Sequence, residues 1–258
     1  MSAANLGTPI VSLNAVGKTF PNGVTAVQGL DLDVRAGETL TLLGPSGCGK
    51  STVLRLIAGL AQPSVGAIHW ANASARQNVG FVFQDPTLLP WADVFANVHL
   101  PLRLQGVSAS KARGRVESAL TRVGLANFRG ALPRELSGGM KMRCAIARAL
   151  VTKPALLLMD EPFAALDEVT RFKLNDDLLA LKHELGTTIV FVTHSVYESV
   201  YLSTRIVVLS AKGGRIIDEI DIDPGIARDA EFRLGPTFAD LCRRASKALQ
   251  SAMGGGSP

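Results

Sequence analysis

The chain has 258 residues, and its 27 basic and 22 acidic side chains give a formal net charge of +5. With 47% hydrophobic and 19% charged residues it can bury a large core, which excludes intrinsic disorder over most of its length. No apolar run approaches the roughly 20 residues that span a bilayer, and the N-terminus lacks the basic start and apolar core of a secretory signal. Three cysteines form neither a paired framework nor a CxxC pattern, so we expect a globular protein of a reducing, cytoplasmic compartment. The charge is compatible with an anionic partner or with an ordinary solvated surface.

The first third of the chain predicts strands that lead into one helix. Apolar residues alternate with polar ones on either side of a turn at Pro21–Gly23, so Ala15 should face inward together with Val11 and Leu13. A compact apolar strand follows and runs into a helix that ends near Gly59. The predicted strands are 11–15, 30–34, 39–43 and 79–83.

Between residues 86 and 152 the pattern changes to helices, and strands return at 155–159, 188–192 and 206–209. A terminal helix at 236–253 and a flexible end at 254–258 complete the chain. Strands and helices thus alternate at both ends of a helical insert, which predicts an α/β fold with helices on the faces of its sheet. A helix between the first two of these strands should end at Gly186 and bury Val169, Phe172, Leu178, Leu181 and Leu185.

The segment Gly44–Ser51 fits the phosphate-loop pattern G-x-x-x-x-G-K-[ST] and stands between a predicted strand and a predicted helix. Its glycines let successive backbone N–H groups turn toward a phosphate, and the helix presents its positive end to the same anion. Lys50 can reach the β- and γ-phosphates, and the hydroxyl of Ser51 can ligate Mg²⁺. The segment therefore predicts a nucleotide-binding site.

A second candidate is the acidic pair Asp160-Glu161, which ends an apolar strand. Carboxylates at the carboxyl end of a buried strand face the crevice where α/β sheets bind ligands. Asp160 is then placed to hold Mg²⁺ through water, and Glu161 to orient and deprotonate an attacking water. Alone, the pair is a weak signal that favours a simple strand-end turn, but together with the phosphate loop upstream it favours the catalytic interpretation.

Two further segments are ambiguous when each is taken alone. Ser137-Gly138-Gly139 opens a predicted helix and so offers a second anion-binding helix start without a lysine, or only a glycine-loosened cap. His194 follows an apolar strand, where a histidine can be catalytic or structural. Their interpretation depends on the other motifs of the chain.

Taken together, these motifs resemble the ATP-binding subunits of ABC transporters over roughly residues 10–220. Phe20 occupies the place of the aromatic residue that stacks on adenine in this family. Six motifs occur in the order found in this family, and together they make accidental similarity negligible. Each of them except the phosphate loop would be a weak signal alone. The motifs are the phosphate loop at 44–52, a Gln loop at 83–85, a signature at 136–140 followed by Arg143, the acidic strand end at 156–161, a D-loop at 165–167 and a switch histidine at 194.

The resemblance implies a P-loop NTPase fold with a RecA-like core sheet, an antiparallel β subdomain and an inserted α-helical subdomain. It places an ATPase domain at 8–222, with its core at about 8–85 and 154–222 and the helical subdomain at about 86–153. Residues 223–258 would form a C-terminal helical extension and flexible tail. It also implies ATP hydrolysis with Mg²⁺, a head-to-tail dimer with a second copy or a homologous ATPase, and a peripheral position on the cytoplasmic face of the inner membrane.

The resemblance also assigns roles to individual residues. Lys50, Gln84, Glu161 and His194 would be catalytic, with His194 contacting the γ-phosphate and the attacking water. Ser51, Gln84 and Asp160 would hold Mg²⁺, and Gln84 would relay to a membrane subunit. The nucleotide would lie between Phe20, Gly44, Pro45, Ser46, Gly47, Cys48, Gly49, Lys50, Ser51 and Thr52 of one chain and Ser137, Gly138, Gly139 and Asp167 of its partner.

The segment Gln84–Trp91 looks like that of importer ATPases for nitrate, taurine and other alkanesulfonates, and Met140 at the last signature position fits the same branch. This implies import of a small solute such as one of these anions through separate permease subunits, with a solute-binding protein as an indirect partner and no nucleic acid. Trp91 would dock a membrane-subunit helix or pack within the helical insert. Ser195 is a departure, since an acidic residue usually follows the switch histidine. The alternatives are a non-transport ABC ATPase acting on nucleic acid or ribosomes, and a nucleotide-binding module without turnover.

Overall fold

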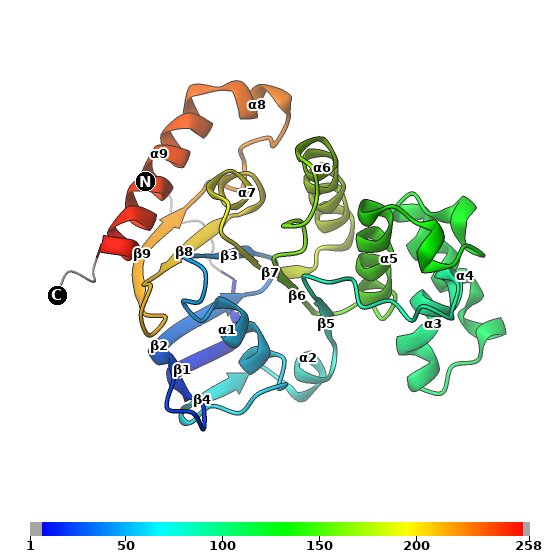
Figure 1. Ribbon diagram of the computed structural model, residues 1–258, viewed down its shortest axis with the longest axis horizontal. Helices are drawn as coiled ribbons and strands as arrows, with labels where there is room; N and C mark the ends of the chain where they lie inside the picture. Colours follow the sequence, from blue (N-terminus) through cyan, green and yellow to red (C-terminus); the bar gives the residue numbers. More distant parts are fainter. Residues whose placement is uncertain (1–6, 255–258) are drawn as a thin grey trace. The chain divides into compact units, whose positions relative to one another are not determined.

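The computed structural model describes residues 7–254. Most of the segment examined for a secretory signal and all but the first residue of the expected flexible end lie outside the described residues. The described chain divides into two compact units, of which the first contains the residues up to Arg76 and those from Thr188 onward. The second unit is Gln77–Thr187. Figure 1 labels the elements of both units.

Nine strands and nine α-helices are found among residues 7–254. The strands are β1 (Pro9–Thr19), β2 (Thr25–Arg35), β3 (Thr39–Leu43), β4 (Val65–Trp70), β5 (Val79–Val82), β6 (Leu156–Asp160), β7 (Thr188–Thr193), β8 (Arg205–Leu209) and β9 (Ile216–Asp221). The helices are α1 (Lys50–Ile57), α2 (Ala73–Gln77), α3 (Val94–Leu104), α4 (Ala109–Arg122), α5 (Gly138–Leu150), α6 (Glu168–Leu185), α7 (Val196–Leu202), α8 (Ala230–Leu234) and α9 (Pro236–Gly254).

The first unit contains two sheets. One is antiparallel with the order β2-β1-β4, and the other has the order β7-β3-β8-β9, in which β3 is parallel to both of its neighbours and β9 is antiparallel to β8. Every residue of β3, β7 and β8 is buried. Strands covered on both faces favour apolar side chains, which is why these three appear in the sequence as short, mostly apolar runs interrupted only by threonines and by Arg205.

The second unit combines the parallel pair β5-β6 with four longer helices. Helices α3, α4 and α5 pack on one another as a group (Figure 1), and α5 also lies against β5. Helix α6 begins at the N-cap Asp167, whose carboxylate accepts the N–H of Thr170. It ends, as predicted, at Gly186, which adopts the left-handed conformation that favours glycine.

The structure confirms the α/β fold class with its mixed sheets and helices, and it corrects two predictions of burial. Ala15 is exposed with φ 47°, because a register shift between Leu13 and Val16 inserts a bulge and turns Val16 inward instead. Val169 and Phe172 are 79% and 41% exposed, because the buried stripe of α6 begins only later, at residues 174, 178 and 181. Strands β4 and β9 and helices α2 and α7 were not predicted.

The sequence predicts neither a disulfide framework nor a membrane-spanning segment. The three cysteines are unbonded and buried, and burial raises the pKa of the Cys144 thiol to about 12 and that of Cys242 to about 11. Both thiols are therefore neutral at physiological pH. Within residues 7–254, no helix has the length and apolarity needed to cross a membrane.

A buried ion pair holds the start of β3 in the first unit. Arg205 donates to both carboxylate oxygens of Glu38, at 2.9 and 3.1 Å, and to Glu219 at 3.0 Å. Burial alone would lower the pKa of Arg205, but the hydrogen bonds and charges of Glu38 and Glu219 outweigh it and raise that pKa. The network joins the residue before β3 to β8 and β9, and β3 leads into the phosphate loop.

Glu38→Gln should lower the free energy of unfolding by about 3 kcal/mol, because it removes the main counter-charge of a buried guanidinium. The matched control is Glu117→Gln, which removes an exposed ion pair with Arg129 and should cost less than about 0.5 kcal/mol. Urea unfolding followed by circular dichroism measures both. Equal effects of the two substitutions would contradict the stabilising role of the buried pair.

Candidate functional site

The phosphate loop connects the buried strand β3 to helix α1, as its pattern predicts. Lys50 is 4% exposed, and its Nζ donates to the carbonyl oxygens of Gly44 and Pro45, at 2.8 and 2.9 Å. These bonds fold the lysine side chain back over the loop and hold its ammonium group at the start of α1. The positive helix end and the ammonium group therefore favour the same anion.

Glycine is required at position 49 by both conformation and space. Gly49 has φ 106°, and a Cβ atom built there would lie 2.2 Å from the carbonyl oxygen of Ala26 in β2. The loop consequently packs against the β1-β2 hairpin. Phe20 stands in the turn of that hairpin and is 37% exposed, and Lys18 Nζ lies 5.6 Å from its ring centroid. An exposed ring on the hairpin that supports the loop is suited to stacking on a base.

His194 lies at the same edge of the sheet as the phosphate loop. Strands β3 and β7 are parallel, with Leu43 opposite Thr193, so Gly44 and His194 both follow this pair at the same edge of the sheet. The His194 side chain is exposed, whereas Thr193 is buried. The phosphate loop and the histidine are thus brought together within the first unit.

A set of hydrogen bonds fixes the backbone on both sides of His194. Thr193 Oγ1 donates to Glu198 Oε2 at 2.5 Å and accepts the N–H of Ser195 at 3.0 Å. The hydroxyl of Ser195 accepts the N–H of Glu198 at 3.3 Å and caps α7. We call Thr193, Ser195 and Glu198 the histidine clamp. Ser195 therefore serves as a helix cap, and the sequence signal for it is the capping pattern Ser-x-x-Glu.

The second unit carries the acidic pair and the Gln loop at one sheet edge. In the parallel pair β5-β6, Val82 lies opposite Met159, and Gln84 and Glu161 each follow two residues later. Asp160 is buried, while Glu161 is half-buried with φ 43°. A left-handed conformation in a residue other than glycine costs about 1 kcal/mol or more and is typical of functional positions.

The signature and the D-loop also meet within the second unit. Ser137 is exposed and caps α5, where its hydroxyl accepts the N–H of Met140 at 3.3 Å. A Cβ atom on Gly139 would lie 2.7 Å from Thr170 Cγ2, so only glycine lets α5 approach the first turn of α6 this closely. Asp167, at the start of that turn, is exposed, and the hydrogen bond from the N–H of Thr170 lowers its pKa. An open helix start and an ionised carboxylate therefore lie side by side.

Arg148 organises the segment after Gln84, a function that was not apparent from the sequence. From α5, its guanidinium donates to the carbonyl oxygens of Pro86 and Thr87, at 2.8 and 2.9 Å, and to the Thr87 hydroxyl at 3.1 Å. Thr87 has φ 47°, a left-handed conformation that these bonds help to hold. A groove of about 530 Å³ borders this contact, with Phe83, Pro101 and Leu104 among its lining residues.

The oxygen donors expected for Mg²⁺ suit that ion. Ser51 in α1 offers a hydroxyl, Asp160 a carboxylate and Gln84 an amide oxygen, and Mg²⁺ takes oxygen ligands. Among residues 7–254, no group of three or more His, Cys, Asp or Glu side chains could hold a metal ion. Hydroxyl, carboxylate and amide oxygens are of the kind that bind Mg²⁺ together with substrate phosphates and water.

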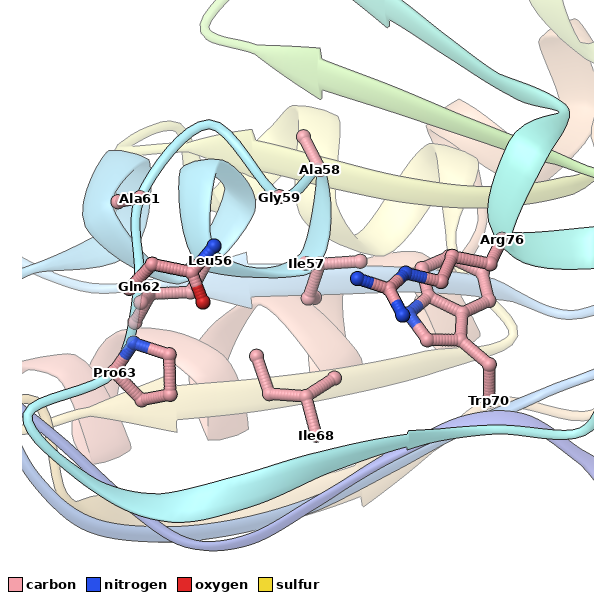
Figure 2. Close-up of a pocket in the computed structure, with 10 residues that line it drawn as sticks. All are labelled: Leu56, Ile57, Ala58, Gly59, Ala61, Gln62, Pro63, Ile68, Trp70 and Arg76. Carbon is pink, nitrogen blue, oxygen red and sulfur yellow. The ribbon is translucent and has the colours of Figure 1, made fainter. Parts of the chain in front are cut away.

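A further hollow of about 350 Å³ lies in the first unit, at the end of α1 opposite the phosphate loop. Figure 2 shows Ile57, Ile68 and Trp70 along it, with the guanidinium of Arg76 near the indole. This hollow meets the negative C-terminal end of α1, whereas a phosphate favours the positive end. It is therefore not the nucleotide site.

Three comparisons place the chain among known proteins. A family model described as ABC transporter matches residues 27–164. The chain is 43% identical over 244 residues to a Brucella abortus protein named as an ATP-binding protein, with 93% of this chain and 94% of that protein covered. It is also 43% identical over 232 residues to aliphatic sulfonates import ATP-binding protein SsuB 1 of Pseudomonas syringae pv. syringae, with 89% and 92% covered.

Solved structures agree with the sequence relatives. The dimeric structure of MJ0796, a bacterial ABC transporter cassette, is 34% identical with a TM-score of 0.74, and the match covers 83% of this chain and 99% of that one. The same values hold for a dimeric post-hydrolysis state of that cassette bound to ADP and Pi. With the family match and the phosphate loop, these likenesses show that the chain belongs to the ABC transporter family, as one of its ATP-hydrolysing cassettes.

Proposed function

We propose that the chain powers the import of a small anionic solute, of the sulfonate, taurine or nitrate class, through separate membrane subunits. The observation that carries this proposal is the 43% identity to a sulfonate-import ATP-binding protein over 89% of the chain. The segment Gln84–Trp91, whose sequence is typical of that importer branch, is ordered by Arg148 beside a groove. In this proposal the chain acts on the cytoplasmic face of the inner membrane.

The proposed site is shared by two copies of the chain arranged head to tail. In each site, residues 44–52 of one copy hold the phosphates of ATP, while Phe20 stacks on adenine. Ser137 and Gly139 of the other copy close on the γ-phosphate, with Asp167 crossing beside them. The exposed start of α5 supports this arrangement, because an uncovered helix N-terminus attracts a phosphate and Ser137 adds a hydroxyl.

Hydrolysis in this site needs positioning and charge neutralisation more than covalent chemistry. Lys50 binds the β- and γ-phosphates, Glu161 orients and deprotonates the attacking water, and His194 donates to the γ-phosphate. Ser51, Asp160 and Gln84 would hold Mg²⁺, which neutralises charge on the phosphates when it is bound. The positions of these residues support the roles, because Asp160 ends β6, Glu161 follows it, and Gln84 follows the neighbouring parallel strand β5.

The groove beside the Gln loop is the proposed docking place for a membrane-subunit helix. Leu104 is 80% exposed at the groove, and Trp91 on the adjoining segment is 77% exposed. Large apolar side chains exposed around a hollow are typical of partner surfaces. Because Arg148 joins the segment after Gln84 to α5, a partner seated here would act on the helix that begins at the signature.

Lys50→Ala and Ser137→Arg should both abolish hydrolysis, but for different reasons. Lys50→Ala removes the cation of the phosphate loop and should weaken ATP binding by at least about tenfold. Ser137→Arg leaves that loop intact but obstructs the partner's γ-phosphate, so each chain should still bind ATP with unchanged affinity. Equilibrium binding of a fluorescent ATP analogue and phosphate release measure the two properties. Turnover that survives Ser137→Arg would contradict the shared site.

Glu161→Gln should leave ATP binding intact, suppress turnover by about 100-fold or more and accumulate an ATP-bound dimer, because the amide cannot accept a proton from water. Gel filtration with ATP and Mg²⁺, compared with ADP and Mg²⁺, measures the association. The control is Glu168→Gln, an exposed change in the first turn of α6 that should leave turnover unchanged. A Glu161→Gln chain that hydrolyses ATP normally would exclude this residue as the base.

Leu104→Glu should prevent binding to the membrane subunits and leave the basal ATPase rate unchanged, because a carboxylate in an apolar groove opposes docking of an apolar helix. Leu60→Glu, an exposed change in the first unit, is the matched control. The test is ATP-dependent alkanesulfonate uptake by the complex reconstituted in vesicles. ATPase activity stimulated by DNA or ribosomes and not by the membrane subunits would instead support a non-transport ATPase.

A further inference from the structure

Helices α8 and α9 follow the last strand of the first unit and pack back onto α7, the helix whose N-cap, Ser195, directly follows His194. In Figure 1, α9 runs along β9 and α8 stands at the start of α9; α9 packs on both α7 and α8. The buried stripe of α9 is Phe238, Cys242, Ala245, Ala248 and Ala252, which recur at helical spacing. The C-terminal helices thus have their own apolar contact with the switch region.

Four aromatic rings form the contact between α7 and the C-terminal helices. Phe232 and Phe238 meet edge to face with ring centroids 5.2 Å apart, Tyr201 lies 6.4 Å from Phe232, and Tyr197 lies 6.0 Å from Phe238. We call these four residues the aromatic brace. Tyr197 and Tyr201 are four residues apart and so share one face of α7.

Polar contacts reinforce the brace at its buried end. The hydroxyl of Tyr201 donates to the carbonyl oxygen of Arg228 at 2.9 Å, and the guanidinium of Arg233 lies 3.8 Å above the Tyr201 ring. Arg228 lies 4.7 Å above the ring of Phe232 and donates to the carbonyl oxygen of Ser203 at the end of α7. Stacked guanidinium groups and a buried phenol contact fix the position of α7 more narrowly than apolar packing alone.

The position of α7 in turn sets the histidine clamp. Glu198 stands between Tyr197 and Tyr201 in α7, is 5% exposed, and accepts the hydroxyl of Thr193. Through Thr193 it also holds the N–H of Ser195, so both neighbours of His194 depend on where Glu198 lies. A continuous series of contacts therefore runs from α9 to the residues on both sides of His194, entirely within the first unit.

We propose that the C-terminal helices are a positioning element for the switch histidine, with Phe238 acting through α7 and Glu198 on His194. The inference rests on the proposed role of His194 at the γ-phosphate. A histidine that must reach the γ-phosphate gains rate from a fixed backbone, because misplacement by a fraction of an ångström lowers turnover more than it lowers ATP binding. The C-terminal helices would thus control kcat without touching ATP.

The test is a double-mutant cycle in the full-length chain between Phe238→Ala and Glu198→Gln. Phe238→Ala should lower kcat for ATP hydrolysis roughly 3- to 10-fold and change KM by less than about 2-fold. Glu198→Gln should give a similar loss, and the double variant should be no slower than the slower single variant, since both act through one clamp. Met253→Ala, an exposed change on α9, is the control and should have wild-type kcat.

Hydrogen exchange supplies a readout that a general loss of stability would not reproduce. In Phe238→Ala the amides of Ser195 and Glu198 should exchange faster, while those of the phosphate loop stay unchanged. If Phe238→Ala does not fold, Phe238→Leu keeps the burial without the ring contact and replaces it. Three results would each overturn the proposal. They are losses in kcat that multiply in the double variant, a change of KM in Phe238→Ala as large as its change in kcat, and faster exchange spread uniformly over the chain.

His194→Ala separates this proposal from the one it rests on. Full turnover by His194→Ala would show that His194 has no catalytic role, and the positioning proposal would fail with it. Loss of turnover in His194→Ala together with normal kcat in Phe238→Ala would overturn the positioning proposal alone. Loss in both, with a non-additive cycle, is the expected result.

Discussion

The phosphate loop sets the strongest geometric constraint on this chain, because it must turn from a buried strand into a helix while directing its N–H groups at one anion. Gly49 meets that requirement where Ala26 leaves no space for a Cβ atom, and Lys50 is held over the loop by two carbonyl oxygens. The rest of the first unit keeps β3 in place: Arg205 and Glu38 at its start, and β7 and β8 along its sides. The buried ion pair and the apolar sheet both hold β3, and β3 in turn positions the phosphate loop.

The two units carry different parts of the proposed chemistry. The first holds the phosphate loop, Phe20 and His194, and the second holds the acidic pair, Gln84 and the signature with its neighbouring D-loop. The signature is an exposed helix start beside an ionised carboxylate, a combination that becomes useful only when a phosphate from elsewhere approaches it. In the proposed dimer, this would explain why a chain with one nucleotide loop has a second exposed helix start of the anion-binding kind.

The sequence predicted the features that arise from local chemistry. The buried strands were predictable because most of their residues are apolar, and the phosphate loop because its glycines follow from backbone geometry. Strand β9 alternates too weakly to be recognised, and the bulge at Ala15 depends on register against β2. The contacts of Arg148 could not be predicted from spacing, since they form only when α5 packs on a segment distant in the sequence. The histidine clamp is local, and its sequence signal is the capping pattern Ser-x-x-Glu.

The central claim is that each ATP site is built from two chains, and mixing two inactive variants tests it directly. A Lys50→Ala chain and a Ser137→Arg chain each lack one half of every site in their own dimers. A mixed dimer joins an intact phosphate loop to an intact signature at one of its two sites. The account predicts that phosphate release reappears on mixing, at about a quarter of the wild-type rate for random pairing. A mixture as inactive as its separate components would contradict it.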